Sequence, residues 1–169
     1  MKKIVILTGA GISAESGLGT FRAEDGLWAE HRVEDVATPE GFVRDPELVM
    51  AFYNARREQS YAASPNAAHA ALAKLQQADG FDVVIVTQNV DDLHERGGAN
   101  VIHMHGGLTT ALCHSCGHTW PAPKVMATSD SCPACAQETT RPDIVWFGEM
   151  PYQMDTIERH LQACDLFVS

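Results

Sequence analysis

The sequence predicts an α/β fold in which a doubly wound parallel sheet is interrupted by a small inserted module. Residues 3–8 and 82–87 are continuous apolar runs, the pattern of strands buried on both faces, and residues 165–168 begin a third run. Helical segments lie between these strands, and alternating strands and helices build parallel sheets. Residues 106–141 interrupt this alternation of strands and helices and contain four cysteines and three prolines, so we expect a separate module there.

Composition is that of a soluble globular protein, with 169 residues, 45% hydrophobic and 20% charged. This length suffices for one domain with a substantial core and a small insertion. We expect residues 1–105 to form a Rossmann-like nucleotide-binding part, residues 106–141 to form the module, and residues 142–169 to return to the first part.

The net charge of −10 argues against nucleic acid as the main partner, because phosphate binding needs a basic surface. No apolar run approaches the roughly 20 residues that a membrane span needs, so no membrane partner is expected. The apolar run at the N-terminus is too short for a signal peptide, and a cytoplasmic location follows. The sequence carries no signal of oligomeric state.

Three helices are expected between the strands. A capping residue followed by proline predicts helices opening at Asp45-Pro46 and Ser64-Pro65, which end near Tyr61 and Ala78. The residues expected on the buried face of the second are Ala68, Leu72 and Leu75. A third helix is expected to begin at Asp155, which resembles the start of a capping box.

A glycine-rich turn directly follows the first strand, with the sequence Gly9-Ala10-Gly11-Ile12-Ser13-Ala14. It fits the G-x-G-x-x-G/A pattern, in which glycines let the backbone approach a pyrophosphate. A tight turn without a ligand is the alternative. Hydride-transfer enzymes need a second strand that ends in an acidic residue about 20 residues on, whereas residues 17–26 are polar and loop-like. A dinucleotide bound differently from such enzymes is therefore expected.

Polar side chains follow the second strand, where ligands of open α/β sheets bind. Gln88, Asn89 and Asp91 offer an amide pair and a carboxylate, which can hydrogen-bond a ribose and a carboxamide. A capped helix start is an alternative for Asp91, although it explains the two amides poorly. His105 precedes a glycine at the edge of the module, and a neutral imidazole there can take a proton from a hydroxyl. The residues His69, His94 and His103 are expected to be structural.

The module contains Cys113-x2-Cys116 and Cys132-x2-Cys135. Four thiolates at this spacing suit a tetrahedral Zn²⁺ site, and a complete ligand set indicates a structural rather than a catalytic metal. A redox pair is the alternative. The fifth cysteine, Cys164, is expected to be a small core residue.

Tyr53 and Arg56 lie three residues apart on the first predicted helix, so both side chains leave the same face. A guanidinium with a phenol hydroxyl can bind a carboxylate. An ordinary solvated arginine beside a half-buried tyrosine is the alternative.

Four motifs in order resemble the sirtuin family: the glycine turn with Thr20-Phe21-Arg22, Gln88-Asn89-Val90-Asp91-Asp92-Leu93-His94, the cysteine pairs, and Arg141-Pro142-Asp143-Ile144-Val145-Trp146-Phe147-Gly148-Glu149. The resemblance implies that Gly9, Ala10, Gly11 and Ser13 belong to an NAD site. It places Phe21 over the ribose intermediate and Arg22 by the phosphates. It also implies that Gln88 contacts the ribose, that Asn89 and Asp91 form the nicotinamide pocket, and that His105 is the general base.

The same resemblance implies an NAD-dependent protein-lysine deacylase with a structural zinc, which yields nicotinamide and O-acyl-ADP-ribose. Val145, Phe147 and Gly148 would bind the substrate peptide by strand addition. The Tyr53-x-x-Arg56 pair resembles that of sirtuins which remove succinyl or malonyl groups. Sirtuins continue beyond the position matching Ser169 with strands that hold the adenosine half of NAD. The alternatives are a regulatory nucleotide-binding module, a zinc-ribbon interaction protein and a mono-ADP-ribosyltransferase.

Overall fold

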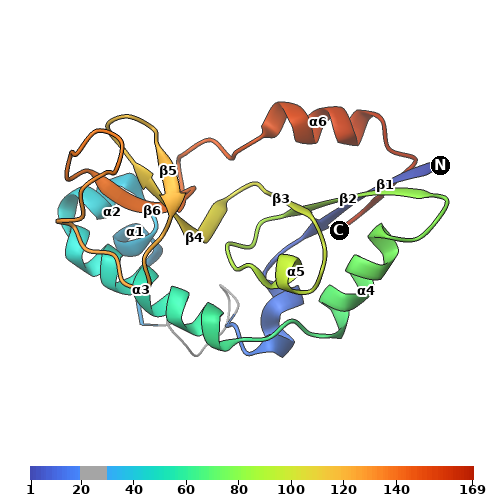
Figure 1. Cartoon of the computed structure of the whole chain (residues 1–169), viewed down its shortest axis with the longest axis horizontal. Helices are drawn as coiled ribbons and strands as arrows, with labels where there is room; N and C mark the ends of the chain where they lie inside the picture. The colour runs from blue at the N-terminus through green and yellow to red at the C-terminus, as the bar shows by residue number, and fades with distance from the viewer. Residues whose placement is uncertain (20–29) are drawn as a thin grey trace.

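The parallel sheet is present. The computed structural model describes residues 1–19 and 30–169, so Phe21 and Arg22 lie outside the described residues. Within those ranges a parallel sheet has the order β3-β2-β1-β7, formed by Val101–His103, Phe81–Thr87, Lys2–Thr8 and Leu166–Val168. The first two predicted strands begin one residue earlier than expected. Figure 1 shows this sheet at one end of the molecule.

Helices cover both faces of the sheet, which confirms the doubly wound prediction. On one face Ile4, Ile6 and Ile85 pack with helix α4 (Ala67–Gln76). On the other face Val5 and Val86 pack with Ile157 of helix α6 (Met154–Gln162). Figure 1 shows α4 and α6 on opposite sides of the strands. Burial on both faces explains why the strands are continuously apolar in sequence.

Helix α3 (Pro46–Ala62) begins as predicted, because the Asp45 side chain accepts a hydrogen bond from Leu48 N at 3.0 Å. The other two predicted starts are wrong. Helix α4 begins after Asn66, whose side chain and that of His69 form a reciprocal capping box. The expected Ser64-Pro65 therefore lies in the preceding extended segment. Helix α6 begins after Gln153, whose φ of 57° is in the left-handed region. Asp155 therefore lies within the first turn of α6 and is not its N-cap residue.

The buried face of α4 also differs from the expectation. Ala68 is exposed, while His69 and Ala73 are buried. Leu72 and Leu75 pack against the sheet as expected. The capping box explains the shift, because it holds the His69 ring on the buried side of the helix.

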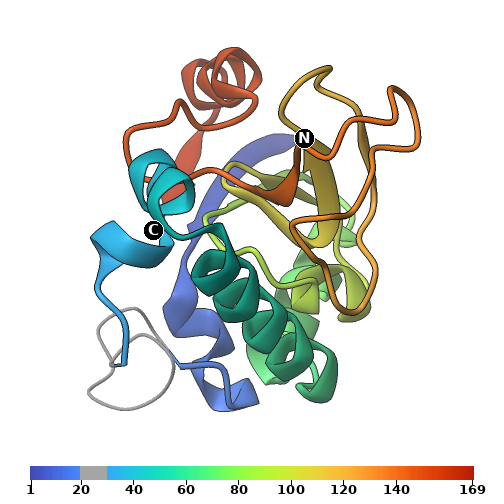
Figure 2. The ribbon, with the colours of Figure 1, turned by 90° about the vertical axis from the view of Figure 1, so that its left-hand side faces the viewer.

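A second, antiparallel sheet has the order β5-β4-β6, formed by Thr119–Pro121, Gly106–Cys113 and Thr140–Ile144. Helices α1 (Val33–Val36), α2 (Pro39–Arg44) and α3 pack against it. Together they form what we call the small lobe. Figure 2 shows α3 across the front of this lobe, with the cysteine-bearing loops on the opposite side from α1 and α2.

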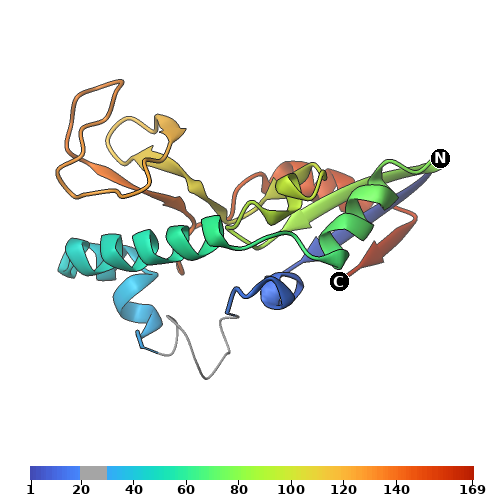
Figure 3. The same ribbon diagram turned by 60° about the horizontal axis from the view of Figure 1, so that its bottom comes forward.

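The core of the small lobe joins segments far apart in the sequence. Its buried members include Val36, Phe52, Tyr53, Leu108 and Trp146. Helix α3 thus belongs with the cysteine module in space, although the sequence places it among residues 1–105. Figure 3 shows α3 extending from the small lobe towards the parallel sheet. None of the helices in the described ranges is both long and apolar enough to cross a membrane.

Gly106 is required at the first pair of β4 with β6. Its φ is 74°, and an added Cβ would overlap the Asp143 carbonyl oxygen. We expect Gly106→Ala to destabilise the protein by roughly 3 kcal/mol or more, because backbone strain and steric overlap add. Urea unfolding checks this value. The matched control is Gly107→Ala, where the nearest atoms lie 3.9 Å away. Equal stability of the two variants would contradict the steric argument.

Candidate active site

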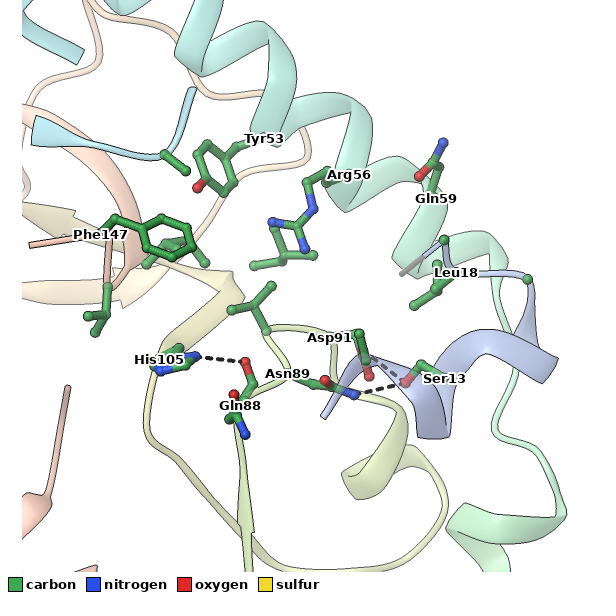
Figure 4. A pocket seen from close by; sticks show the side chains of 18 residues that line it. Ser13, Leu18, Tyr53, Arg56, Gln59, Gln88, Asn89, Asp91, His105 and Phe147 are labelled. Carbon is green, nitrogen blue, oxygen red and sulfur yellow. Dashed lines mark hydrogen bonds between the residues drawn. The ribbon is translucent and has the colours of Figure 1, made fainter. Parts of the chain in front are cut away.

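A cavity of about 600 Å³ lies between the parallel sheet and the small lobe, where β1 and β2 end. It is lined by most of the residues that sequence analysis selected: Ala10, Ser13, Tyr53, Arg56, Gln88, Asn89, Asp91, His105, Val145 and Phe147. In Figure 4, Tyr53 and Arg56 lie on one side of it and His105, Asn89 and Asp91 on the other. The expected residues Gly9, Gly11 and Gly148 are outside the lining.

The glycine turn forms a 3-10 helix (Ala10–Ser16) rather than an α-helix, with Gly9 at its N-cap. A Cβ at Gly11 would meet nothing within 4 Å, so its backbone borders open space. Gly17 closes the helix with a φ of 86°. The turn therefore presents bare backbone beside the cavity, as close approach of a pyrophosphate requires.

Ser13 connects the turn to the end of β2. Its hydroxyl donates to Asp91 Oδ2 at 3.1 Å and accepts from Asn89 Nδ2 at 3.1 Å. All three residues are buried. These bonds fix the side chains of Asn89 and Asp91 before any ligand binds (Figure 4).

His69 extends this network behind the cavity. Its Nδ1 accepts from Asn66 N at 3.2 Å, so Nε2 carries the proton and lies 3.5 Å from Ser13 Oγ. Burial lowers the pKa of His69, although Asp91 opposes the shift, and the ring stays neutral. The expectation that His69 is structural thus omitted its contact with the site. The spacing of Asn66 and His69, which is that of a capping box, is the signal that could have revealed it.

His94 lies beside this network. Its Nε2 is 3.0 Å from Thr8 Oγ1, and its ring centroid is 5.0 Å from that of His69. Burial, and then the neighbouring His69, lower the pKa of His94. The Nδ1 atom is buried without a hydrogen-bond partner among the described residues.

The His105 ring is oriented by a backbone carbonyl. Its Nδ1 lies 3.1 Å from the Gln88 carbonyl oxygen, which can only accept, so Nδ1 carries the proton (Figure 4). In the neutral form of the ring, Nε2 then carries the free lone pair. The carbonyl itself is fixed, because Gln88 N donates to Thr8 O at 2.9 Å.

His103 anchors the loop that carries Asn89. Its Nδ1 lies 2.9 Å from Asn89 O and its Nε2 lies 2.7 Å from Glu95 Oε1. Both partners are acceptors, so both ring nitrogens carry protons and the ring is cationic. Burial alone would lower the pKa of His103, but the hydrogen bond to Glu95, the Glu95 charge, the Asn89 carbonyl and Asp91 together raise it. Burial alone would raise the pKa of Glu95, but the hydrogen bond from His103 and the His103 charge, with smaller contributions from a backbone hydrogen bond and His94, together lower it.

This pair predicts a pH-dependent stability. The raised pKa of His103 means that its stabilisation is complete below its unfolded pKa of about 6.5 and is lost as pH rises through the folded value. The lowered pKa of Glu95 means that its contribution is lost only on acidification. We expect the melting temperature of Glu95→Gln to fall below that of the wild type at pH 6, and the difference to shrink by pH 9. An equal difference at both pH values would contradict this assignment.

Tyr53 and Arg56 project from α3 at the other end of the cavity (Figure 4). The guanidinium carbon lies 5.6 Å from the Tyr53 ring centroid. Burial lowers the pKa of Arg56, while Tyr53 and Asp91 oppose the shift. Burial also raises the pKa of Tyr53. The pair therefore presents a neutral phenol beside a cation.

Val145 and Phe147 lie along the rim of the cavity. Val145 N donates to His105 O at 3.0 Å, and Phe147 N donates to Ala37 O at 2.9 Å. The Phe147 side chain is 58% exposed. Gly148, with a φ of 91°, is absent from the lining. Sequence analysis missed Leu18, Ala37 and Gln59, which also line the cavity and carry no recognisable motif.

The four cysteines of the module converge as a metal site. Their sulfur atoms all lie within 4.8 Å of one another, with Cys113 and Cys135 at 3.6 Å and Cys116 and Cys132 at 3.8 Å. A tetrahedron with Zn–S bonds of about 2.3 Å has edges of about 3.8 Å, so the set fits zinc. Disulfides would need about 2.05 Å.

The two cysteine turns have matching backbones. Gly117 N donates to Cys113 O at 2.9 Å, and Ala136 N donates to Cys132 O at 2.8 Å. Both donors have positive φ values, 72° and 59°. The polypeptide is thus shaped to aim four sulfur atoms at one point.

The sequence matches the Sir2 family over residues 9–169. A relative from Escherichia coli strain K12, named NAD-dependent protein deacylase, is 57% identical over 99% of this chain. The chain spans 61% of that relative's length. A solved Sir2 homolog–NAD complex is 44% identical, with a TM-score of 0.87 over 98% of this chain and 66% of the other. A Sir2 protein bound to a myristoylated histone peptide is 30% identical, with a TM-score of 0.66 over 98% of this chain and 66% of the other. Because the family match covers most of the sequence and the fold agrees, the chain belongs to the Sir2 family.

Proposed function

We propose that the protein is an NAD-dependent protein-lysine deacylase that prefers acyl groups ending in a carboxylate, such as succinyl and malonyl. One observation carries the proposal: a single cavity joins a histidine, a buried amide–carboxylate pair and a tyrosine–arginine pair. The name of the Escherichia coli relative and the NAD complex of a homolog support the activity.

NAD would supply an electrophilic ribose carbon and nicotinamide as the leaving group. Asn89 and Asp91, whose side chains Ser13 holds in place, would bind the nicotinamide carboxamide. Gln88 would contact the ribose from the end of β2. The bare backbone around Gly11 would border the pyrophosphate.

His105 would act as general base. The carbonyl oxygen of the acylated lysine would first displace nicotinamide from the ribose carbon. The His105 Nε2 would then accept the proton of a ribose hydroxyl, which attacks the acyl carbon, and one water would release the lysine. The Gln88 carbonyl would hold the opposite Nδ1–H and stabilise the cationic ring that results. The products would be free lysine, nicotinamide and O-acyl-ADP-ribose. Because the cysteine set offers four sulfur ligands and no open position, zinc would serve the fold and not the chemistry.

Tyr53 and Arg56 would receive the carboxylate of the acyl group. A carboxylate accepts hydrogen bonds from both a phenol and a guanidinium, and such charge-assisted bonds are stronger than neutral ones. The acylated lysine side chain would enter between Val145 and Phe147, at the rim beside His105. The histone peptide bound by a Sir2 relative supports a protein substrate.

Nicotinamide release tests this function. The protein is incubated with NAD and a peptide carrying succinyl-lysine, acetyl-lysine or free lysine. We expect release only with acylated peptides, and faster with succinyl-lysine. Release independent of acylation, with ADP-ribose left on protein, would instead indicate a mono-ADP-ribosyltransferase. No release, with NAD still raising the melting temperature, would indicate a binding module. If NAD also left the melting temperature unchanged, a zinc-ribbon interaction protein would remain.

Arg56→Met is expected to raise KM for succinyl-lysine about 10- to 100-fold, because a hydrogen bond to a charged group is worth about 1.5–3 kcal/mol. The increase in KM for acetyl-lysine is expected to be much smaller, since that group has no carboxylate. Steady-state kinetics with both peptides measure the two values. Equal effects on the two substrates would reject Arg56 as the carboxylate receptor.

A further inference from the structure

We propose that Trp146 determines acyl specificity by positioning Tyr53: its indole N–H fixes the Tyr53 hydroxyl so that the phenolic proton points into the cavity and selects acyl groups that can accept it. This inference rests on the proposed deacylase function and deepens it. Trp146 is absent from the cavity lining, so it would act through Tyr53 and not by touching the substrate.

The contact is a buried hydrogen bond between residues 93 positions apart. Trp146 Nε1 lies 3.0 Å from the Tyr53 hydroxyl oxygen, and the two residues are 2% and 1% exposed. An indole nitrogen can only donate. The Tyr53 oxygen is therefore the acceptor, and its own proton must point elsewhere.

A second polar neighbour of this hydroxyl, Arg56, is also a donor. The Arg56 guanidinium lies over the Tyr53 ring and carries no acceptor atom. Among the hydrogen bonds of residues 1–19 and 30–169, none gives the Tyr53 proton an acceptor. Tyr53 lines the cavity, so the proton and the guanidinium both face the space where the acyl group would lie.

The two donors distinguish acyl groups by whether each group offers an acceptor for them. A carboxylate accepts from both donors, whereas an acetyl methyl group leaves a buried O–H without a partner. Sites built to hydrogen-bond a substrate reject analogues that lack the matching group far more strongly than apolar pockets do. Trp146 makes Tyr53 such a site, because without the indole bond the hydroxyl is free to rotate away.

Trp146 is itself held from two sides. The Arg141 guanidinium carbon lies 3.6 Å from the indole centroid, and Glu149 Oε2 accepts from Trp146 N at 2.8 Å. Arg141 also makes two hydrogen bonds of 2.8 Å to Glu149. Burial alone would raise the pKa of Glu149, but the hydrogen bonds from Arg141 and from Trp146 N, together with the Arg141 charge, lower it, so the carboxylate stays charged. The Arg141–Glu149 clamp thus fixes the direction of the indole N–H.

A double-mutant cycle tests the proposal. Trp146→Phe keeps an aromatic ring under Arg141 but removes the donor, and Tyr53→Phe removes the acceptor. We expect Trp146→Phe to lower the ratio of kcat/KM for succinyl-lysine to that for acetyl-lysine about 5- to 30-fold, mainly through KM. In the Tyr53→Phe background the same change is expected to leave the ratio within about 2-fold. An equal loss in both backgrounds would show that Trp146 acts by packing alone and would overturn the inference.

The outcomes separate this inference from the deacylase proposal. A wild-type protein that turns over no acyl-lysine refutes the proposed function itself. Succinyl-lysine turnover that Trp146→Phe leaves unchanged refutes only the role of Trp146. If Trp146→Phe does not fold, the indole N–H resonance of Trp146 replaces the cycle. We expect it to move upfield in Tyr53→Phe, and an unchanged resonance would overturn the inference.

Discussion

Replacing His105 with glutamine is expected to lower kcat for deacylation by about 10²- to 10⁴-fold, the range that a positioned general base contributes. Glutamine has a similar size and can still hydrogen-bond Gln88 O, but it cannot take a proton near neutral pH. The melting temperature is expected to stay within a few degrees, because His105 is only half-buried. Steady-state kinetics and thermal unfolding measure the two effects.

The step that His105 catalyses can be isolated. In the proposed reaction nicotinamide leaves before His105 acts, so the variant is expected to keep exchanging labelled nicotinamide into NAD. His160→Gln on α6, outside the cavity, serves as the matched control and is expected to keep full turnover. Full turnover by His105→Gln would remove this histidine from the mechanism. Loss of nicotinamide exchange would place it earlier in the reaction.

Removing zinc is expected to unfold the small lobe. Structural zinc contributes about 10–16 kcal/mol of apparent binding free energy in isolated zinc fingers, which exceeds the whole stability of many domains. Here Cys113 and Cys132 are buried, and strand β5 has only 3 residues. We expect Cys132→Ser to lose the bound metal and the ordered tryptophan signal of near-UV circular dichroism. Metal analysis and spectroscopy check both.

Unfolding of the small lobe would also disturb the cavity, because α3 packs on the cysteine module. Asn54 pairs with both backbone groups of Met126, at 2.8 and 2.9 Å, and Arg57 Nε donates to Leu108 O at 2.7 Å. These contacts hold α3, with its Tyr53–Arg56 pair, on the cysteine module. Cys164→Ser is the control, since Cys164 lies outside the cluster, and it is expected to retain zinc and stability. A zinc-free Cys132→Ser protein with unchanged spectra would contradict a structural metal.

The parts of the fold that local physics determines could be predicted from the sequence. Strands β1 and β2 are continuous apolar runs because both faces are covered, and Asp45-Pro46 starts α3 because the aspartate satisfies a free N–H. The start of α4 was missed because Ser64 and Asn66 are both good caps. Which one is used depends on the His69 ring, which completes the capping box.

The site residues that belong to sequence motifs could be predicted. Those whose position depends on packing between distant segments could not. Gln88, Asn89, Asp91 and His105 follow strands directly, so the strand ends bring them together. No local pattern indicates that α3 packs on the cysteine module. The bond between Tyr53 and Trp146 joins positions 93 residues apart, and it exists because both side chains fill one core.

Mass spectrometry of the products tests the central claim most directly, namely that one cavity binds the dinucleotide and the acylated lysine together. A succinyl-lysine peptide is incubated with the protein and NAD, and all species are weighed. We predict unmodified peptide, nicotinamide and O-succinyl-ADP-ribose in equal amounts. An unchanged peptide, or free succinate with intact NAD, would contradict the account.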